Sequence, residues 1–308
     1  MRRDASTRAG YDRAVVNALL DALLPRLPAR HAALVGLSGL QASGKSTLAS
    51  QLATTAREGG VFVEVLSLDD FYLGRRDRAA LARNVHPLLA TRGVPGTHDV
   101  ALILETVRAL RAASSQRPVR IPRFDKGRDT RLPPSRWRNV TSPPRLILLE
   151  GWCIGVPPEA QRALTRAVNS LELRQDADAR WRTWVNARLA GEYAALWQRL
   201  DALIVLLAPS FEIVSRWRGE PERALRKRGA PRAMSGAMLR RFLMHYERLS
   251  RHALRTLPAL ADIVVPLDAS RRAESIRASA PARRPLPSRT RALPSRPAQP
   301  RSRRSASR

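Results

Sequence analysis

The sequence predicts an α/β protein with a doubly wound, mainly parallel five-stranded sheet and helices on both faces. Three observations predict it: short apolar runs alternate with helical patterns, a glycine-rich loop joins the first run to a helix, and carboxylates end two later runs. Short runs without polar residues are typical of strands buried on both faces. Their alternation with helices is typical of sheets that bind ligands beyond the carboxyl ends of their strands.

The predicted elements follow from these patterns in chain order. The expected strands cover residues 32–37, 61–66, 146–149, 202–207 and 263–265. Helical periodicity covers residues 47–57, 100–113, 158–167, 179–200 and 234–257.

Two segments are expected to flank a central domain of residues 31–269. Residues 270–308 should be a disordered basic tail, because Arg, Ser, Ala and Pro make up 33 of these 39 residues and leave little apolar area to bury. Residues 1–30 should form an amphipathic helix, with one apolar face made by Val15, Val16, Leu19, Leu20, Leu23 and Leu24.

Inside the domain, residues 71–144 are too long for one crossover and rich in Pro, Gly and Arg, so we expect an insertion on the substrate side. Residues 211–231 follow the fourth expected strand and are strongly basic. Such a segment could close over a nucleotide and bring Arg216 or Arg218 to a transferring phosphate. A solvated charged helix is an equally good interpretation of either residue.

The loop after the first expected strand has the pattern G-x-x-x-x-G-K-[ST]. Its glycines allow a tight turn whose backbone N–H groups face an anion, its lysine places a point charge at terminal phosphates, and its hydroxyl can bind Mg²⁺. The chain has only 3 lysines beside 52 arginines, so a chance match is a poor explanation. The residues expected to bind a nucleoside triphosphate are Gly39, Leu40, Gln41, Ala42, Ser43, Gly44, Lys45, Ser46 and Thr47.

Carboxylates stand at the ends of two other expected strands: Asp69 and Asp70 after the second, and Glu150 after the third. Beside a phosphate loop, such acids can take the proton of a hydroxyl or hold Mg²⁺. We expect Asp69 to be the catalytic base, and Ser46, Glu150 and Asp69 to be the candidate metal ligands. The alternative is that the Asp pair only opens a turn, and this structural role is a stronger alternative for Asp70 than for Asp69.

Two stretches of the insertion mix charge with turn residues, as a pocket for a small polar substrate would. Arginine forks suit a carboxylate or phosphate, although each residue taken singly is more typical of a surface or turn position. The substrate candidates are Asp70, Tyr72, Arg92, His98, Asp125, Lys126 and Arg128.

The net charge of +29 does not by itself indicate a nucleic-acid partner. The last 39 residues contribute +11, and the remaining +18 is spread over 269 residues, which favours a general arginine bias over a binding patch. Cys153 is the single cysteine, and no apolar segment is long enough for a membrane helix. We therefore expect a cytoplasmic monomer with a small-molecule substrate, no membrane association and no nucleic-acid partner.

These motifs resemble D-glycerate 3-kinases of the plant and fungal type and their bacterial relatives, within the P-loop kinases that include uridine kinase, phosphoribulokinase and pantothenate kinase. The matching stretches lie within residues 31–268: GLQASGKSTLA, SLDDFYL, RGVPGTHD, RFDKGRD, LLEGWCIG, ARWRTWVNARLAGEYAALW and HYERLSRH.

The resemblance implies the P-loop NTPase fold and transfer of the γ-phosphate of Mg·ATP to a hydroxyl of a small acid, with D-glycerate first. It also implies Asp69 as base, Glu150 near the metal and residues 216–228 as a lid. A related kinase acting on a nucleoside, pantothenate or a sugar phosphate is the runner-up. A nucleic-acid-binding ATPase that uses the basic tail is the alternative from another class.

Overall fold

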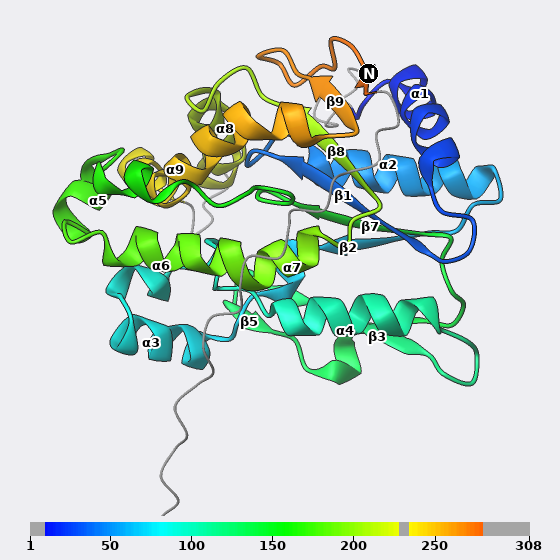
Figure 1. Ribbon diagram of the computed structural model, residues 1–308, viewed down its shortest axis with the longest axis horizontal. Coiled ribbons are helices and arrows are strands. Elements are labelled where there is room, and N and C mark those ends of the chain that lie inside the picture. Colours follow the sequence, from blue (N-terminus) through cyan, green and yellow to red (C-terminus); the bar gives the residue numbers. More distant parts are fainter. Residues whose placement is uncertain (1–9, 228–233, 280–308) are drawn as a thin grey trace, which may run out of the picture.

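A six-stranded sheet runs through the centre of the computed structural model, which describes residues 10–227 and 234–279 (Figure 1). The strand order is β10-β9-β8-β1-β7-β2. The five predicted strands are present and pair in parallel, while β10 is an antiparallel edge strand that was not predicted. The strands are β1 (Ala33–Gly39), β2 (Val63–Ser67), β7 (Leu146–Gly151), β8 (Ala202–Leu207), β9 (Ile263–Pro266) and β10 (Arg277–Ala278).

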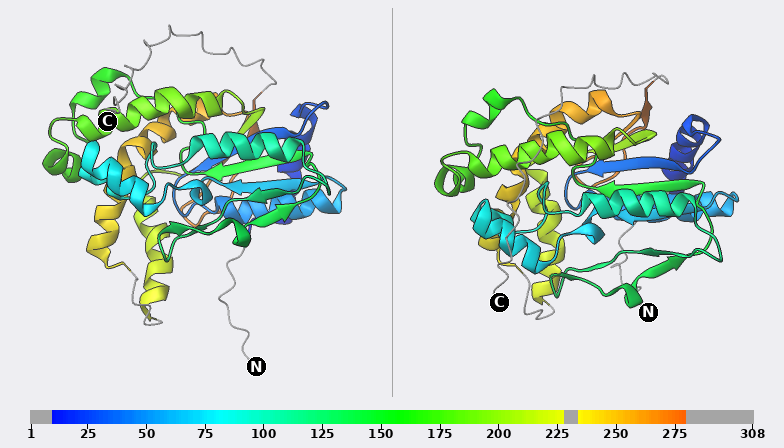
Figure 2. Two further views of the ribbon diagram at one scale, coloured as in Figure 1. Left: turned by 90° about the horizontal axis from the view of Figure 1, so that it is seen from below. Right: turned by 60° about the horizontal axis from the view of Figure 1, so that its bottom comes forward.

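Helices cover both faces of this sheet (Figure 2). Successive residues of a strand point to opposite faces, and Leu34 and Val35 of β1 accordingly belong to two different apolar cores. The first core contains residues of α4, α6 and α7, the second contains residues of α1, α2 and α8, and α9 contributes to both. The helices are α1 (Arg13–Leu23), α2 (Lys45–Glu58), α3 (Arg75–Asn84), α4 (Val100–Arg111), α5 (Ser170–Gln175), α6 (Arg180–Arg188), α7 (Ala194–Trp197), α8 (Ile213–Lys227) and α9 (Gly236–Leu260).

The segment between β2 and β7 holds α3, α4 and two small antiparallel ribbons. One ribbon pairs β3 (Val119–Ile121) with β6 (Arg138–Val140), and the other pairs β4 (Phe124–Asp125) with β5 (Thr130–Arg131). Only part of this segment is an insertion, because α4 packs its apolar face into the core like the other crossover helices.

The amphipathic helix predicted near the N-terminus is α1. Its buried residues include Val16, Leu19 and Leu23, and they share a core with α2. The helix is therefore packed against the sheet domain rather than set apart from it.

The prediction of disorder from residue 270 onward is wrong for residues 270–279. Arg271 forms an ion pair with Glu220 and lies over the ring of Trp217, and the indole N–H of Trp217 donates to the carbonyl of Ala269 at 2.8 Å. Residues 277 and 278 form β10. Residues 280–308 of the predicted tail and 228–231 of the predicted lid lie outside the described residues.

The helix predicted over residues 158–167 is also wrong, because this stretch has only one 3₁₀ turn, Gln161–Thr165. Arginines from neighbouring helices donate hydrogen bonds to the carbonyl groups of this stretch. Arg248 of α9 donates to the carbonyls of Ala163 at 3.0 Å and Arg166 at 2.5 Å, and Arg182 of α6 donates to Leu164 at 2.7 Å. These carbonyls serve tertiary contacts and not helical hydrogen bonds.

Arg248→Ala should lower the free energy of unfolding by about 3–5 kcal/mol, since it removes the partner of buried carboxylates. The Arg248 guanidinium makes two 2.8 Å bonds to Glu172 and one 3.2 Å bond to Glu159. The matched control is Arg251→Ala on the same helix, whose side chain is 38% exposed and whose ion pairs should be worth about 0–1 kcal/mol. Urea titration measures both variants, and equal losses would contradict this account.

Candidate active site

The phosphate loop lies between β1 and α2, and close packing explains its glycines. A Cβ atom on Gly39 would lie 3.0 Å from the Leu206 carbonyl and 3.0 Å from Ser43 Oγ. Gly44 has φ 91°, and Ala42 also adopts a left-handed conformation with φ 60°. The loop therefore turns tightly into the first residue of α2, which is Lys45.

Polar groups of this loop are buried without partners, which fits the binding of a phosphate chain. Ser43 Oγ and both polar atoms of the Gln41 amide have no hydrogen-bond partner among the described residues. Lys45 is 8% exposed, and its ammonium donates to the Leu40 carbonyl at 2.9 Å. Burial lowers the pKa of Lys45, and the carboxylates of Glu150 and Asp69 oppose that shift.

Glu150 is the last residue but one of β7 and lies beside the phosphate loop, as predicted. Its Oε1 accepts hydrogen bonds from Ser46 Oγ at 2.9 Å and from Ser67 Oγ at 2.7 Å. Ser67 was not predicted, although it is the last residue of β2 and stands opposite Glu150 in the parallel register. Clustered carboxylate and hydroxyl oxygens are ligands that suit Mg²⁺, so Ser46 and Glu150 fit the metal that accompanies a nucleotide.

Asp69 lies in the 3₁₀ turn that follows β2, and two donors hold its carboxylate. The Tyr72 hydroxyl donates to Oδ1 at 2.6 Å, and the Lys126 ammonium donates to Oδ2 at 2.6 Å. Burial alone would raise the pKa of Asp69, but the charge of Lys126 and the two hydrogen bonds outweigh it, so the pKa is lowered. The side chain is therefore an ionised carboxylate near neutral pH.

Arg92 lies over two aromatic rings, one of which belongs to Tyr72, the residue that donates to Asp69. Its guanidinium lies 5.9 Å from the ring centre of Tyr72 and 5.7 Å from that of Phe124. It donates to the carbonyl of Lys126 at 3.3 Å and forms an ion pair with Asp129. The role of Asp129 was not predicted, although it is the last residue of the RFDKGRD stretch.

Three other substrate candidates, Asp70, Asp125 and Arg128, make contacts with nearby residues of the chain. Asp70 Oδ1 accepts the N–H of Phe124 at 3.0 Å, and burial raises the pKa of Asp70. Asp125 accepts the N–H groups of Gly127 and Arg128, both at 2.9 Å, which forms a turn. Arg128 is 74% exposed and faces Asp125 at 3.8 Å. The structure does not bring Asp125 or Arg128 to Asp69.

The two predicted lid arginines differ in position on α8. Arg216 is 59% exposed and lies 3.9 Å from Glu220 of the next helical turn. Arg218 is half-buried, and its charge acts on the phenol of Tyr246. Arg218 thus acts on Tyr246, the residue whose hydroxyl donates to the Arg92 carbonyl.

Glycines of the RGVPGTHD stretch let two helices pack closely against it. A Cβ atom on Gly93 (φ 128°) would lie 2.0 Å from the Tyr246 hydroxyl, and one on Gly96 (φ 91°) would lie 2.3 Å from Trp184. The Tyr246 hydroxyl donates to the Arg92 carbonyl at 2.9 Å. Tyr246 belongs to HYERLSRH, so that stretch supports the backbone that carries Arg92.

His86, Asp176 and Asp178 form a second cluster of possible metal ligands. Nδ1 of His86 accepts the N–H of Leu88 at 3.2 Å, so the proton of the neutral ring is on Nε2, which faces Asp176 at 3.8 Å. Asp176 also accepts the N–H of Trp181 at 2.6 Å. Because His86 and Asp176 already bond to other groups of the protein, we interpret the cluster as a structural contact and not as a metal site.

Tyr11 makes a contact with the phosphate loop that was not predicted. Its hydroxyl donates to the Ser43 carbonyl at 2.9 Å, and its backbone N–H and C=O both bond to the Gln51 side chain. The C=O and N–H of one planar peptide point in opposite directions. The contact therefore turns the Gly44 N–H to the side of the loop opposite Tyr11.

Tyr11→Phe should weaken nucleotide binding by about 2- to 10-fold, the value of one ordinary hydrogen bond. The phenyl ring still packs against Gly44, so the thermal midpoint should change little. Calorimetric titration with ATP measures the affinity, and the KM for the acceptor serves as an internal control. An unchanged ATP affinity would show that the contact does not orient the loop.

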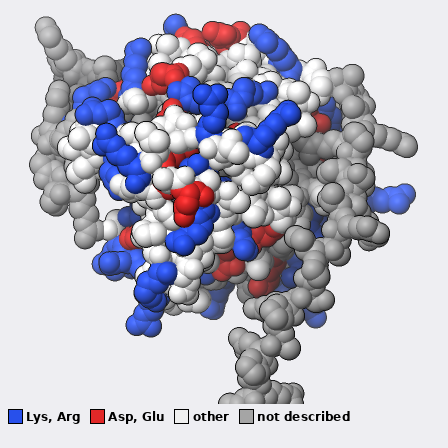
Figure 3. Space-filling model, turned by 60° about the vertical axis from the view of Figure 1, so that its left-hand side comes forward, with Lys and Arg blue, Asp and Glu red and all other residues white. Residues whose placement is uncertain are grey.

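Basic side chains on the face shown in Figure 3 are interleaved with acidic ones and do not form one continuous patch. No helix in the described ranges combines the length and apolar character needed to cross a bilayer.

Known proteins are similar to this chain in sequence and fold, although no family model matches it. It is 35% identical over 226 residues to the uncharacterized kinase mug58 of Schizosaccharomyces pombe, an alignment that covers 69% of this chain and 78% of that protein. It is 31% identical over 233 residues to the chloroplastic D-glycerate 3-kinase of Arabidopsis thaliana, with 73% of this chain and 48% of the plant protein covered. The chain thus spans about half the length of that relative. A solved structure of D-glycerate 3-kinase from Cryptococcus neoformans var. grubii has a TM-score of 0.73 at 20% identity, with 87% of this chain and 100% of that chain covered.

Proposed function

The chain belongs to the family of P-loop kinases that includes D-glycerate 3-kinase, and we propose that it transfers the γ-phosphate of Mg·ATP to a hydroxyl group of D-glycerate. Membership makes it a phosphotransferase with an alcohol group as acceptor. The observation that carries the substrate proposal is the ionised Asp69 carboxylate, which forms an ion pair with Lys126 and accepts the hydroxyl of Tyr72. A second cation, Arg92, lies over the rings of Tyr72 and Phe124.

The roles of the residues follow from their contacts. Lys45 and the loop N–H groups hold the β- and γ-phosphates, while Ser46 and Glu150 supply oxygen ligands for Mg²⁺. Magnesium held by these two residues would neutralise charge on the phosphates. Asp69 takes the proton of the acceptor hydroxyl while the oxygen of that hydroxyl forms a bond to the γ-phosphorus. The bond from that phosphorus to the β–γ bridging oxygen breaks, and ADP leaves.

A small acid fits this site better than a nucleoside. A base pocket needs free aromatic faces, but Phe71 and Trp152 are core residues that are 0% and 4% exposed. Tyr72 and Phe124 are also buried, at 4% and 6% exposed, and Arg92 lies over both rings. A guanidinium and an ammonium near the base suit the carboxylate of a hydroxy acid.

ATP turnover measured with D-glycerate, L-glycerate, uridine, pantothenate and a pentose phosphate tests the proposal. The highest kcat/KM is expected with D-glycerate. A preference for uridine, pantothenate or the sugar phosphate would replace the acceptor while leaving the kinase activity in place.

Truncation after Ser279 should leave the kcat/KM for ATP and acceptor within about twofold of the full chain, because no residue of the proposed site lies beyond that point. A cut after Asp268 would be a poor test, since it also removes β10 and the Arg271–Glu220 ion pair. ATP hydrolysis that DNA or RNA stimulates in the full chain and not in the truncated chain would support a nucleic-acid-binding ATPase.

A further inference from the structure

His98 has one edge of its ring bonded and the other edge without a partner. The side chain is 3% exposed, and Nδ1 lies 2.7 Å from the Tyr193 hydroxyl oxygen. Nε2 is buried and has no hydrogen-bond partner among the described residues. A buried polar atom without a partner is uncommon and calls for an explanation.

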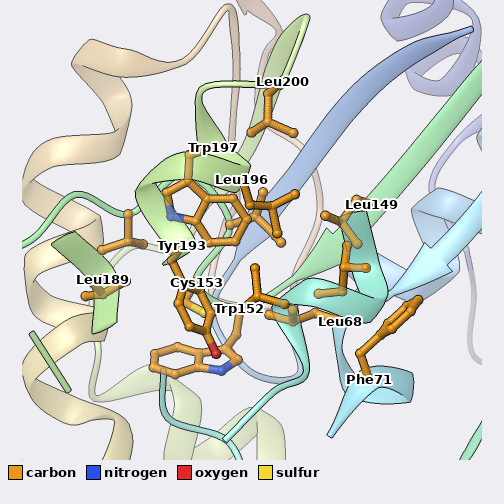
Figure 4. Close-up of a cluster of buried hydrophobic side chains, with 14 of the residues drawn as sticks. Leu68, Phe71, Leu149, Trp152, Cys153, Leu189, Tyr193, Leu196, Trp197 and Leu200 are labelled. Carbon is orange, nitrogen blue, oxygen red and sulfur yellow. The ribbon is translucent and has the colours of Figure 1, made fainter. Parts of the chain in front are cut away.

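Tyr193 comes from the π-helical turn Leu189–Tyr193 between α6 and α7. Figure 4 shows its ring projecting into the apolar cluster beside Trp152 and Cys153. The side chain is 0% exposed, so its hydroxyl can bond only to groups of the protein.

The hydrogen bonds of Tyr193 determine which nitrogen of His98 carries the proton. The Tyr193 oxygen accepts the N–H of Gly96 at 2.9 Å. The buried hydroxyl proton needs an acceptor of its own, and Nδ1 of His98 is the one acceptor for it among the described residues. If Nδ1 of His98 carried the ring proton instead, the buried hydroxyl proton of Tyr193 would have no acceptor, which is unfavourable. The proton of the ring is therefore on Nε2.

The charge state of His98 is settled by its surroundings. Burial lowers the pKa of His98 to about 4, although the Asp69 carboxylate acts in the opposite direction. The ring is thus neutral near pH 7 and cannot act as a cation for a substrate acid.

The ring of His98 packs against the residue that bonds to the base. The imidazole stacks on the Tyr72 ring with centroids 4.7 Å apart, and Tyr72 donates to Asp69. The backbones of Tyr72 and His98 also form an isolated bridge. A neutral donor here can hold an oxygen atom without forming an ion pair with Asp69, so the base stays available for the hydroxyl proton.

We propose that His98 donates its Nε2–H to an oxygen atom of the acceptor substrate, and that Tyr193 is a positioning residue that sets this tautomer. The proposal rests on the hydroxy-acid kinase activity proposed above, and it adds the group that would align the acceptor beside Asp69.

His98→Gln and His98→Asn test the donor. The Gln amide nitrogen can reach the position of Nε2, whereas the Asn amide nitrogen corresponds to Nδ1. We expect Asn to raise the KM for the acceptor by about tenfold or more and Gln to keep it within about threefold, with the KM for ATP unchanged in both. Equal effects of the two variants on the acceptor, with normal thermal midpoints, would overturn the donor role.

Tyr193→Phe combined with ¹⁵N NMR of the histidines tests the positioning role. In the unaltered protein, His98 should show a protonated Nε2 and an unprotonated Nδ1. In Tyr193→Phe, the signals should move toward a tautomer mixture, and the acceptor KM should rise several-fold. A protonated Nδ1 in the unaltered protein, or an unchanged tautomer and KM in the variant, would overturn the proposal. The NMR measurement needs no substrate, so it tests the tautomer of His98 whether or not D-glycerate is the acceptor.

Discussion

Lys45→Ala should lower the kcat/KM for ATP by at least about 10²- to 10³-fold, the effect of removing a group that stabilises developing charge at a transferring phosphoryl group. Lys45 supplies the ammonium of the phosphate loop, it is 8% exposed, and within the loop it bonds only to the Leu40 carbonyl. Its contacts to phosphate would form in a nearly dry site, where electrostatic interactions are stronger than in water. Steady-state kinetics with ATP varied at saturating acceptor measures the loss.

The matched control for Lys45→Ala is Arg57→Ala, which removes an exposed cation from the same helix. It should leave kcat/KM within about twofold, because exposed charges are screened. Circular dichroism and the thermal midpoint show whether either variant is folded. A folded Lys45→Ala protein with near-normal kcat/KM would refute phosphate binding by this loop.

The phosphate loop and the acidic strand ends could be predicted because their signals are local. The loop motif is contiguous, Glu150 follows an apolar run directly, and Asp69 comes three residues after the end of another. In a parallel sheet the carboxyl ends of neighbouring strands meet at one edge, and the register pairs Ser67 of β2 with Glu150 of β7. Sequence order and the geometry of parallel strands were therefore sufficient to bring these groups together.

Contacts between distant segments could not be predicted in this way. Lys126 holds Asp69 from 57 residues away, and Tyr193 holds His98 from 95 residues away. The apolar and helical periodicity of residues 158–167 gives no sign that Arg248 takes their carbonyls. β10 has two residues and antiparallel pairing, so it lacks any apolar run to detect. These features depend on tertiary contacts that leave no periodic trace in the sequence.

Asp69→Asn should lower kcat by about 10²- to 10⁴-fold, because the amide cannot accept the hydroxyl proton. The KM for ATP should change little, since the phosphate loop is untouched. The Asn oxygen can still accept the bond from Tyr72, so the turn after β2 should keep its shape. Single-turnover kinetics at saturating ATP and acceptor measure the chemical step directly.

Asp70→Asn is the matched control for the neighbouring carboxylate. The Asn oxygen can still accept the N–H of Phe124, the one hydrogen bond described for the Asp70 side chain, so kcat should stay near normal. If Asp70→Asn lowers kcat by orders of magnitude while Asp69→Asn does not, the base is Asp70.

Lys126→Met connects this base to the pH dependence of the reaction. The Lys126 ammonium is the cation that holds the pKa of Asp69 below its ordinary value, against the effect of burial. Without that charge the pKa of Asp69 must rise, so the carboxylate becomes protonated at a higher pH as the solution is acidified. The acid limb of the kcat profile should therefore move to higher pH in Lys126→Met. An acid limb at the same pH, with kcat still sensitive to Asp69→Asn, would mean that Lys126 leaves Asp69 once substrates bind.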